Sequence, residues 1–114
     1  MNEKRKTLRI HPFVAPCRLV AGERTLMGYL TDLSEAGARV TTEAEPPAAG
    51  APVTLALRIG RVAARSRLDA RVEWVRKQDP GWMFGLSFAG LPADQQAALK
   101  AVVAEFQRLA AEIA

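Results

Sequence analysis

Alternation of apolar and polar residues dominates the middle of the chain and predicts β-strands. The clearest case is residues 67–75, where Leu68, Ala70, Val72 and Trp74 alternate with charged residues. A period of two directs successive side chains to opposite faces of a strand, so one face of this strand is expected to be buried. Five further segments have the same strand character: 13–20, 25–33, 38–42, 53–59 and 82–88.

Glycine and proline mark the turns between these segments. Gly22 lies between the first two, Pro-Pro-Ala-Ala-Gly occupies residues 46–50, Gly60 separates the fourth from the fifth, and Gln-Asp-Pro-Gly at 78–81 is typical of a hairpin loop. Six short strands at this spacing indicate a small closed or nearly closed antiparallel barrel. Pro16 cannot donate a ladder hydrogen bond, so the first strand is predicted to lie at an edge or to bulge there.

The apolar pattern changes to a helical period near the end of the chain. The residues with this spacing are Leu99, Val102, Val103, Phe106, Leu109, Ala110 and Ile113. Pro92 and Asp94 suit the first turn of a helix. The pattern predicts an amphipathic helix of about twenty residues, whose apolar stripe packs on its own barrel or on a second copy. A monomer or a weak homodimer is therefore expected.

The organisation expected from these patterns is one domain in three parts. A length of 114 residues suits a single domain. Residues 1–12 show no periodicity and are predicted to form a flexible basic arm, residues 13–91 the barrel, and residues 92–114 the helix that packs on it. The fold class is therefore mainly β, with a C-terminal amphipathic α-helix.

Charge and composition limit the kinds of partner and the cellular location that are expected. Sixteen Lys and Arg residues against twelve Asp and Glu give a net charge of +4, which favours an anionic partner. The chain lacks an apolar run long enough to span a membrane, and its first residues lack the apolar core of a secretory signal. The single cysteine, Cys17, excludes an intramolecular disulfide. A cytoplasmic protein without membrane insertion is the simplest interpretation.

Signals for catalysis are weak. One histidine, His11, and one cysteine do not provide the usual donor set of a metal site. The sequence also contains neither a glycine-rich phosphate loop nor a recognisable nucleophile motif. We therefore expect no enzymatic activity, no metal and no cofactor. A small nucleic-acid-binding barrel is a further candidate. Such a barrel would need exposed aromatic residues interleaved with basic residues, and the sequence lacks a run of this kind. We therefore expect no nucleic-acid partner.

Two short motifs carry the strongest functional signal. The predicted arm contains Arg5-Lys6-Thr7-Leu8-Arg9, and the end of a predicted strand contains Asp32-Leu33-Ser34-Glu35-Ala36-Gly37. In this order the chain resembles the PilZ domain family, whose signature is RxxxR followed by [D/N]xSxxG. The resemblance extends over nearly the whole chain, because the six-strand-then-helix order and the late sequences VEWV (72–75) and GLSF (85–88) also fit. It implies a PilZ-like six-stranded barrel that binds cyclic di-GMP, a bacterial second messenger.

The resemblance implies that five residues bind this ligand: Arg5, Arg9, Asp32, Ser34 and Gly37. Their chemistry fits, because a guanidinium fork can donate to the adjacent guanine acceptors O6 and N7 or to phosphate. A carboxylate can accept from the guanine N1–H and N2–H₂ groups. A serine hydroxyl can donate to phosphate or accept from the base. Glycine permits a tight turn, including one with φ > 0, and a close approach of ligand to backbone.

Three more residues are candidates for the same site. Lys4 and Arg39 would add positive charge for the phosphates, and some family members place an aromatic ring against the ligand at the position of Trp74. Simpler interpretations stand beside these. The arm also fits a solvated basic tail, and residues 32–37 fit an Asx or Ser turn that ends a strand. Trp74 shares the parity of Leu68 and Val72, which favours packing in the core.

The function implied by the resemblance is that of a receptor and adaptor. Cyclic di-GMP would bind through both motifs, and the bound protein would signal to a downstream protein that controls motility, biofilm or polysaccharide. The sequence leaves the ligand stoichiometry open between one molecule and a stacked pair. The alternative is a protein-interaction module that has the fold but does not use the ligand. Pilus-related family members behave this way, but they generally lack the two motifs.

Overall fold

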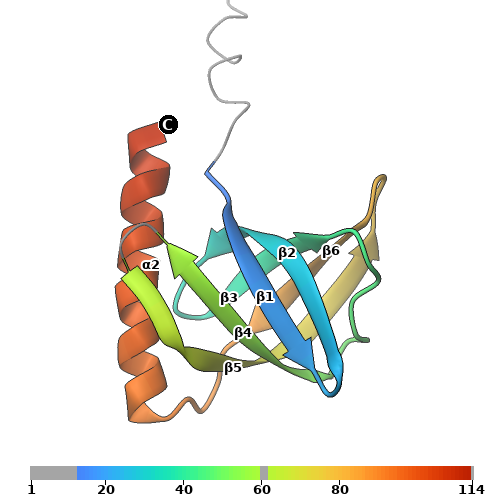
Figure 1. The fold of residues 1–114 in the computed structure, drawn as a ribbon, viewed down its shortest axis with the longest axis horizontal. Helices are drawn as coiled ribbons and strands as arrows, with labels where there is room; N and C mark the ends of the chain where they lie inside the picture. Colours follow the sequence, from blue (N-terminus) through green and yellow to red (C-terminus); the bar gives the residue numbers. More distant parts are fainter. Residues whose placement is uncertain (1–12, 60–61, 114) are drawn as a thin grey trace, which may run out of the picture.

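The computed structural model describes residues 13–59 and 62–113, with the backbone alone described at 58, 62–66 and 113. The described residues form six strands and one helix: β1 (Ala15–Ala21), β2 (Arg24–Leu33), β3 (Gly37–Thr42), β4 (Pro52–Ile59), β5 (Val62–Lys77), β6 (Trp82–Ser87) and α2 (Ala93–Ile113). The strands close into a barrel in the order β1-β2-β3-β6-β5-β4, with every neighbouring pair antiparallel (Figure 1). The prediction of a mainly β, six-stranded antiparallel barrel with a C-terminal helix is confirmed.

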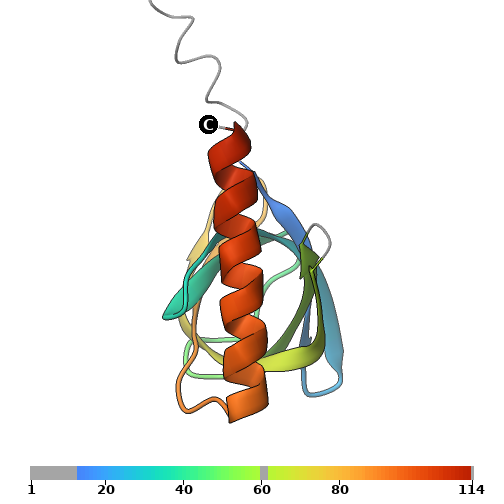
Figure 2. The same cartoon turned by 90° about the vertical axis from the view of Figure 1, so that its left-hand side faces the viewer.

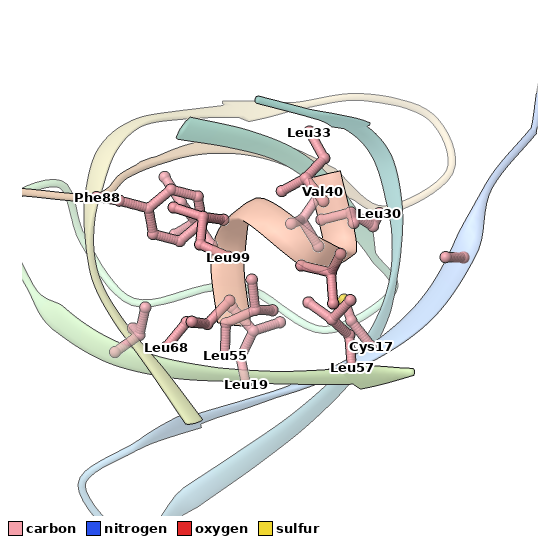
Figure 3. Close-up of a cluster of buried hydrophobic side chains, with 14 of the residues drawn as sticks. Cys17, Leu19, Leu30, Leu33, Val40, Leu55, Leu57, Leu68, Phe88 and Leu99 are labelled. Carbon is pink, nitrogen blue, oxygen red and sulfur yellow. The ribbon is translucent and has the colours of Figure 1, made fainter. Parts of the chain in front are cut away.

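The barrel interior is filled by the apolar half of each alternating strand. In β1, for example, the burial alternates so that Ala15, Cys17 and Leu19 point inward while the residues between them are exposed. Figure 3 shows Cys17 and Leu19 of β1 converging with Leu30 of β2, Leu55 of β4 and Leu68 of β5. Burial raises the pKa of the Cys17 thiol to about 12, so the thiol stays protonated at neutral pH.

Helix α2 covers part of this core. Leu99, Val102, Val103 and Phe106 are buried and belong to the same apolar cluster as the barrel residues. Figure 2 shows the helix lying across the ring of strands, and its contacts are mainly with β5. The side chain of Gln95 accepts a hydrogen bond of 2.8 Å from the backbone N–H of Asp69 in β5. The predicted apolar stripe therefore packs within its own chain.

Two expectations about the strands are corrected. β1 is not an edge strand and has no bulge at Pro16, because it pairs with β2 on one side and with β4 on the other. The β4 register begins only at Cys17, so Pro16 lies just outside that ladder, where its missing N–H costs nothing. β5 begins at Val62 and not at residue 67, because its first residues extend the ladder with β4 although their sequence does not alternate.

Besides a register shift between Leu55 and Leu57 in the β4–β5 pair, two further register shifts interrupt the strand pairs of the barrel. One lies between Leu30 and Asp32 in the β2–β3 pair, and the other between Val72 and Trp74 in the β5–β6 pair. A bulge adds one residue to a strand and reverses the inward and outward alternation beyond it. Both shifts therefore change which side chains reach the outer surface here. Among the described residues, no helix is long and apolar enough to cross a membrane.

Candidate ligand-binding site

Five of the residues predicted from the sequence line one pocket on the outside of the barrel. The pocket has a volume of about 190 Å³ and is lined by Asp32, Ser34, Gly37, Ala38, Arg39, Glu73, Trp74, Gly85 and Leu86. The fold thus brings together the DxSxxG segment and two of the three further candidates, although β3 and β5 are far apart in sequence. The remaining predicted residues, Lys4, Arg5 and Arg9, lie outside the described residues.

The strand register arranges four of these residues in one row. Asp32 of β2 pairs with Arg39 of β3, Arg39 pairs with Gly85 of β6, and Gly85 pairs with Trp74 of β5. Neighbouring strands are about 4.8 Å apart, so three steps span roughly 14 Å. Asp32, Arg39 and Trp74 are all exposed. A carboxylate, a guanidinium and an indole therefore follow one another across the outer face of the barrel.

The expectation that Trp74 packs in the core is wrong. Its side chain is 36% exposed, whereas Val72 is buried. The register shift between these two residues makes Glu73 the extra residue of a bulge, which turns both Glu73 and Trp74 outward. Val75 then resumes the inward position and packs against the core. The bulge thus converts what the sequence presents as a core tryptophan into an exposed aromatic surface.

Gly85 makes room for this tryptophan. A Cβ atom built at Gly85 would lie only 2.6 Å from Cε2 of Trp74 and would also overlap Nε1, so the indole rests directly against the β6 backbone. The guanidinium of Arg76 lies 5.3 Å from the centroid of the Trp74 ring, within cation–π range. A glycine inside a strand pattern is a known sign of close approach, and it is the sequence signal that could have placed Trp74 here.

The DxSxxG segment folds as a tight turn held by Ser34. The Ser34 Oγ accepts hydrogen bonds from the backbone N–H groups of Ala36 (3.2 Å) and Gly37 (3.3 Å), and the Ser34 N–H donates to the Gly37 carbonyl (2.9 Å). The Ser-turn interpretation of this segment is therefore correct.

Glycine was expected at position 37 either for a turn with φ > 0 or for a close approach to the backbone, and only the second kind of reason applies. Its φ is not in the positive region, which excludes the left-handed conformation. A Cβ at this position would instead overlap the carbonyl oxygen of Leu86 on the neighbouring strand. Glycine thus allows β3 and β6 to approach closely at the edge of the pocket.

Among the charged residues that line the pocket, Glu73 is the one that the sequence patterns did not single out. The Ser87 hydroxyl donates a hydrogen bond of 2.6 Å to its Oε2. Ser87 is also the register partner of Gly37 in β3 and of Arg71 in β5, so Gly37, Ser87 and Arg71 form a second row beside the first. Glu73 is the unpaired residue of the bulge and reaches this row through its hydrogen bond with Ser87. Among the residues that the structure describes, no cluster of His, Cys, Asp and Glu could hold a metal ion. The site instead combines hydrogen-bond acceptors, a cation and an aromatic face, which suits a ligand with bases and phosphates.

Comparison with known proteins places this barrel in a family. The PilZ domain model matches residues 3–105. The fold resembles "PilZ domain with c-di-GMP of YcgR from Escherichia coli" (TM-score 0.67, 18% identity, covering 91% of this chain and 95% of that chain). It also resembles the PilZ domain of CeSA from a cellulose-synthesizing bacterium (TM-score 0.65, 20% identity, 85% and 96% covered).

A third similar structure is the inhibitor of motility MotI/DgrA of Bacillus subtilis (TM-score 0.65, 15% identity). The match covers 87% of this chain and 49% of that chain. At these identities the structural likeness concerns the fold. The comparison with curated proteins gave no match. The family model spans nearly the whole chain, including the segment that contains Arg5 and Arg9, and the barrel with its helix has the same architecture as PilZ structures. The chain therefore belongs to the PilZ domain family.

Proposed function

We propose that this protein is a receptor for cyclic di-GMP that binds the messenger in the pocket between β2, β3, β5 and β6 and transmits its presence to a protein partner without catalysing a reaction. The observation that carries the proposal is the row formed by Asp32, Arg39, Gly85 and Trp74, which joins the DxSxxG segment to an exposed indole. The similar YcgR domain is described as a complex with c-di-GMP, which supports the same ligand class here.

The pocket residues match the chemistry of this ligand. The exposed Trp74 indole offers a flat face on which a guanine can stack, and Asp32 offers acceptors for a guanine N1–H and N2–H₂ edge. Arg39 supplies a positive charge for a phosphate between them. The Ser34 oxygen already accepts hydrogen bonds from two backbone N–H groups. Its O–H donates to the Gly37 carbonyl over a long distance of 3.4 Å. We propose that this O–H donates to a phosphate oxygen of the ligand instead.

Arg5 and Arg9 complete the proposed site from the N-terminal segment. The described chain begins at Phe13, whose ring contacts that of Phe106 in α2 with 5.1 Å between centroids. Two residues later, Ala15 pairs with Leu30 of β2, so the chain enters the barrel one strand away from Asp32. Four residues span up to about 14 Å when extended, and we propose that Arg9 uses this length of chain to contact a ligand in the pocket.

Tryptophan fluorescence tests the stacking step of this proposal. Titration of the full chain with cyclic di-GMP is expected to quench the emission, because the base covers Trp74. Trp82 lies near Lys77 beside the turn of the β5–β6 hairpin and serves as the control. The Trp82→Phe variant should keep the change and Trp74→Phe should lose it. Trp74→Ala should weaken binding about 5- to 150-fold, since stacking contributes ~1–3 kcal/mol per base. A ligand that binds with full affinity to Trp74→Ala would contradict this role.

A further inference from the structure

Glu73 occupies a distinctive position at the boundary between two pockets. It lines the pocket that contains Trp74 and Asp32, and it also lines a neighbouring pocket of about 320 Å³ with Arg71 and Ser87. The bulge directs the side chains of Glu73 and Trp74 to the same outer face although the two residues are adjacent in sequence. A carboxylate therefore stands beside an exposed indole.

The Glu73 carboxylate is held in place but keeps unused acceptor capacity. Its Oε2 accepts the Ser87 hydroxyl at 2.6 Å. An ionised carboxylate has about four acceptor positions on its two oxygens, so this bond leaves Oε1 and part of Oε2 available. Within the described part of the chain, no lysine or arginine forms an ion pair with Glu73. The group is therefore oriented by its neighbour without being neutralised by one.

We propose that Glu73 is a specificity residue that reads the Watson–Crick edge of a guanine stacked on Trp74. That edge presents two adjacent donors, N1–H and N2–H₂, which suit a carboxylate, whereas adenine presents an acceptor at N1 and would be repelled. Cyclic di-GMP contains two guanines, and the pocket offers two carboxylates, Asp32 at one end of the row and Glu73 beside the other. Each guanine would thus meet its own carboxylate. This inference rests on the proposed function.

The test compares cyclic di-GMP with its inosine analogue cyclic di-IMP. The bases of the analogue keep O6, N7 and N1–H but lack the N2 amino group. Isothermal titration of the full chain is expected to show a clear preference for cyclic di-GMP. In Glu73→Gln this ratio of affinities should fall about tenfold, because a side-chain amide presents one acceptor and one donor to an edge with two donors.

Two further variants distinguish a local role of Glu73 from a general effect of charge. Glu23→Gln removes the same charge in the β1–β2 turn, at the opposite end of β2 from Asp32, and should leave the ratio unchanged. Ser87→Ala removes the hydroxyl that orients Glu73 and should lower the ratio less than Glu73→Gln does. Melting temperatures close to that of the wild type would show that all variants are folded.

Other outcomes overturn the inference in distinguishable ways. If Glu73→Gln changes the affinities for both ligands by the same factor, Glu73 acts through overall charge or through a basic residue of the N-terminal segment, and not through the guanine edge. If neither affinity changes in Glu73→Gln while the wild-type protein binds cyclic di-GMP, the inference fails and the proposed function stands. If the wild-type protein binds neither cyclic dinucleotide, the proposed function fails with it.

Discussion

Replacing Arg9 with alanine is expected to weaken cyclic di-GMP binding by at least about a hundredfold, because a lost bidentate guanidinium contact removes ~3 kcal/mol and each 1.4 kcal/mol is tenfold. Arg5→Ala should have an effect of similar size. Both residues belong to the RxxxR motif, and lysine would not restore the planar fork at either position. Isothermal titration of the full chain measures the loss directly.

The matched control for these variants is Arg18→Ala. Arg18 is an exposed arginine on β1, which does not contribute to the pocket, so its removal changes the net charge equally without changing the proposed site. If Arg18→Ala weakened binding as much as Arg9→Ala, the attraction would be a general effect of charge. If both motif variants bound normally, the assignment of the RxxxR arginines to the ligand would be wrong.

The largest effect on stability is expected from Phe84→Ala. Phe84 is fully buried at the middle of β6, where it pairs with Val40 of β3 and Val75 of β5. Truncation of a buried phenylalanine costs about 3–5 kcal/mol, which is a large part of the 5–15 kcal/mol that stabilises a typical domain. We expect the melting temperature to fall by roughly 12–20 °C, or the variant to fail to fold.

Tyr29→Ala provides the comparison for this prediction. Tyr29 is an aromatic residue on β2 whose side chain is 56% exposed, so its truncation should change the stability by less than about 0.5 kcal/mol. Thermal unfolding followed by circular dichroism measures both variants. A Phe84→Ala protein that melts within a few degrees of the wild type would contradict the packing described for the barrel.

Much of the fold could be predicted because barrel strands and the helix have different hydrophobic periods. The strands near residues 53–59 and 82–88 and the stripe through Leu99 and Phe106 lie where their patterns indicated. The start of β5 could not be found this way, since residues 62–66 have no alternation and are ordered by backbone pairing with β4. The interpretation of Pro16 failed because sequence alone does not show where a ladder begins.

The site was only partly predictable, because the bulge in β5 changes which of its side chains face outward. Residues 67–74 alternate strictly, so this stretch does not reveal that the register with β6 shifts after Val72, and only the apolar Val75 directly after Trp74 departs from the pattern. The shift moves Trp74 from the predicted core face to the surface and brings Glu73 beside it. By contrast, Asp32, Ser34 and Gly37 could be selected because their motif is local and resembles a family signature. Gly85 could also have been selected, because a glycine within a strand pattern indicates the close approach of another group, here Trp74.

The central claim is that the pocket formed by Asp32, Arg39 and Trp74 binds cyclic di-GMP together with the N-terminal arginines. Isothermal titration of the full wild-type chain with cyclic di-GMP, beside GTP and cyclic GMP, tests it most directly. We predict micromolar or tighter binding that is selective for cyclic di-GMP, and the titration will also give the stoichiometry. A folded protein that gives no binding heat and no ligand-dependent change in melting temperature would contradict the claim and favour a PilZ module that acts through protein contacts alone.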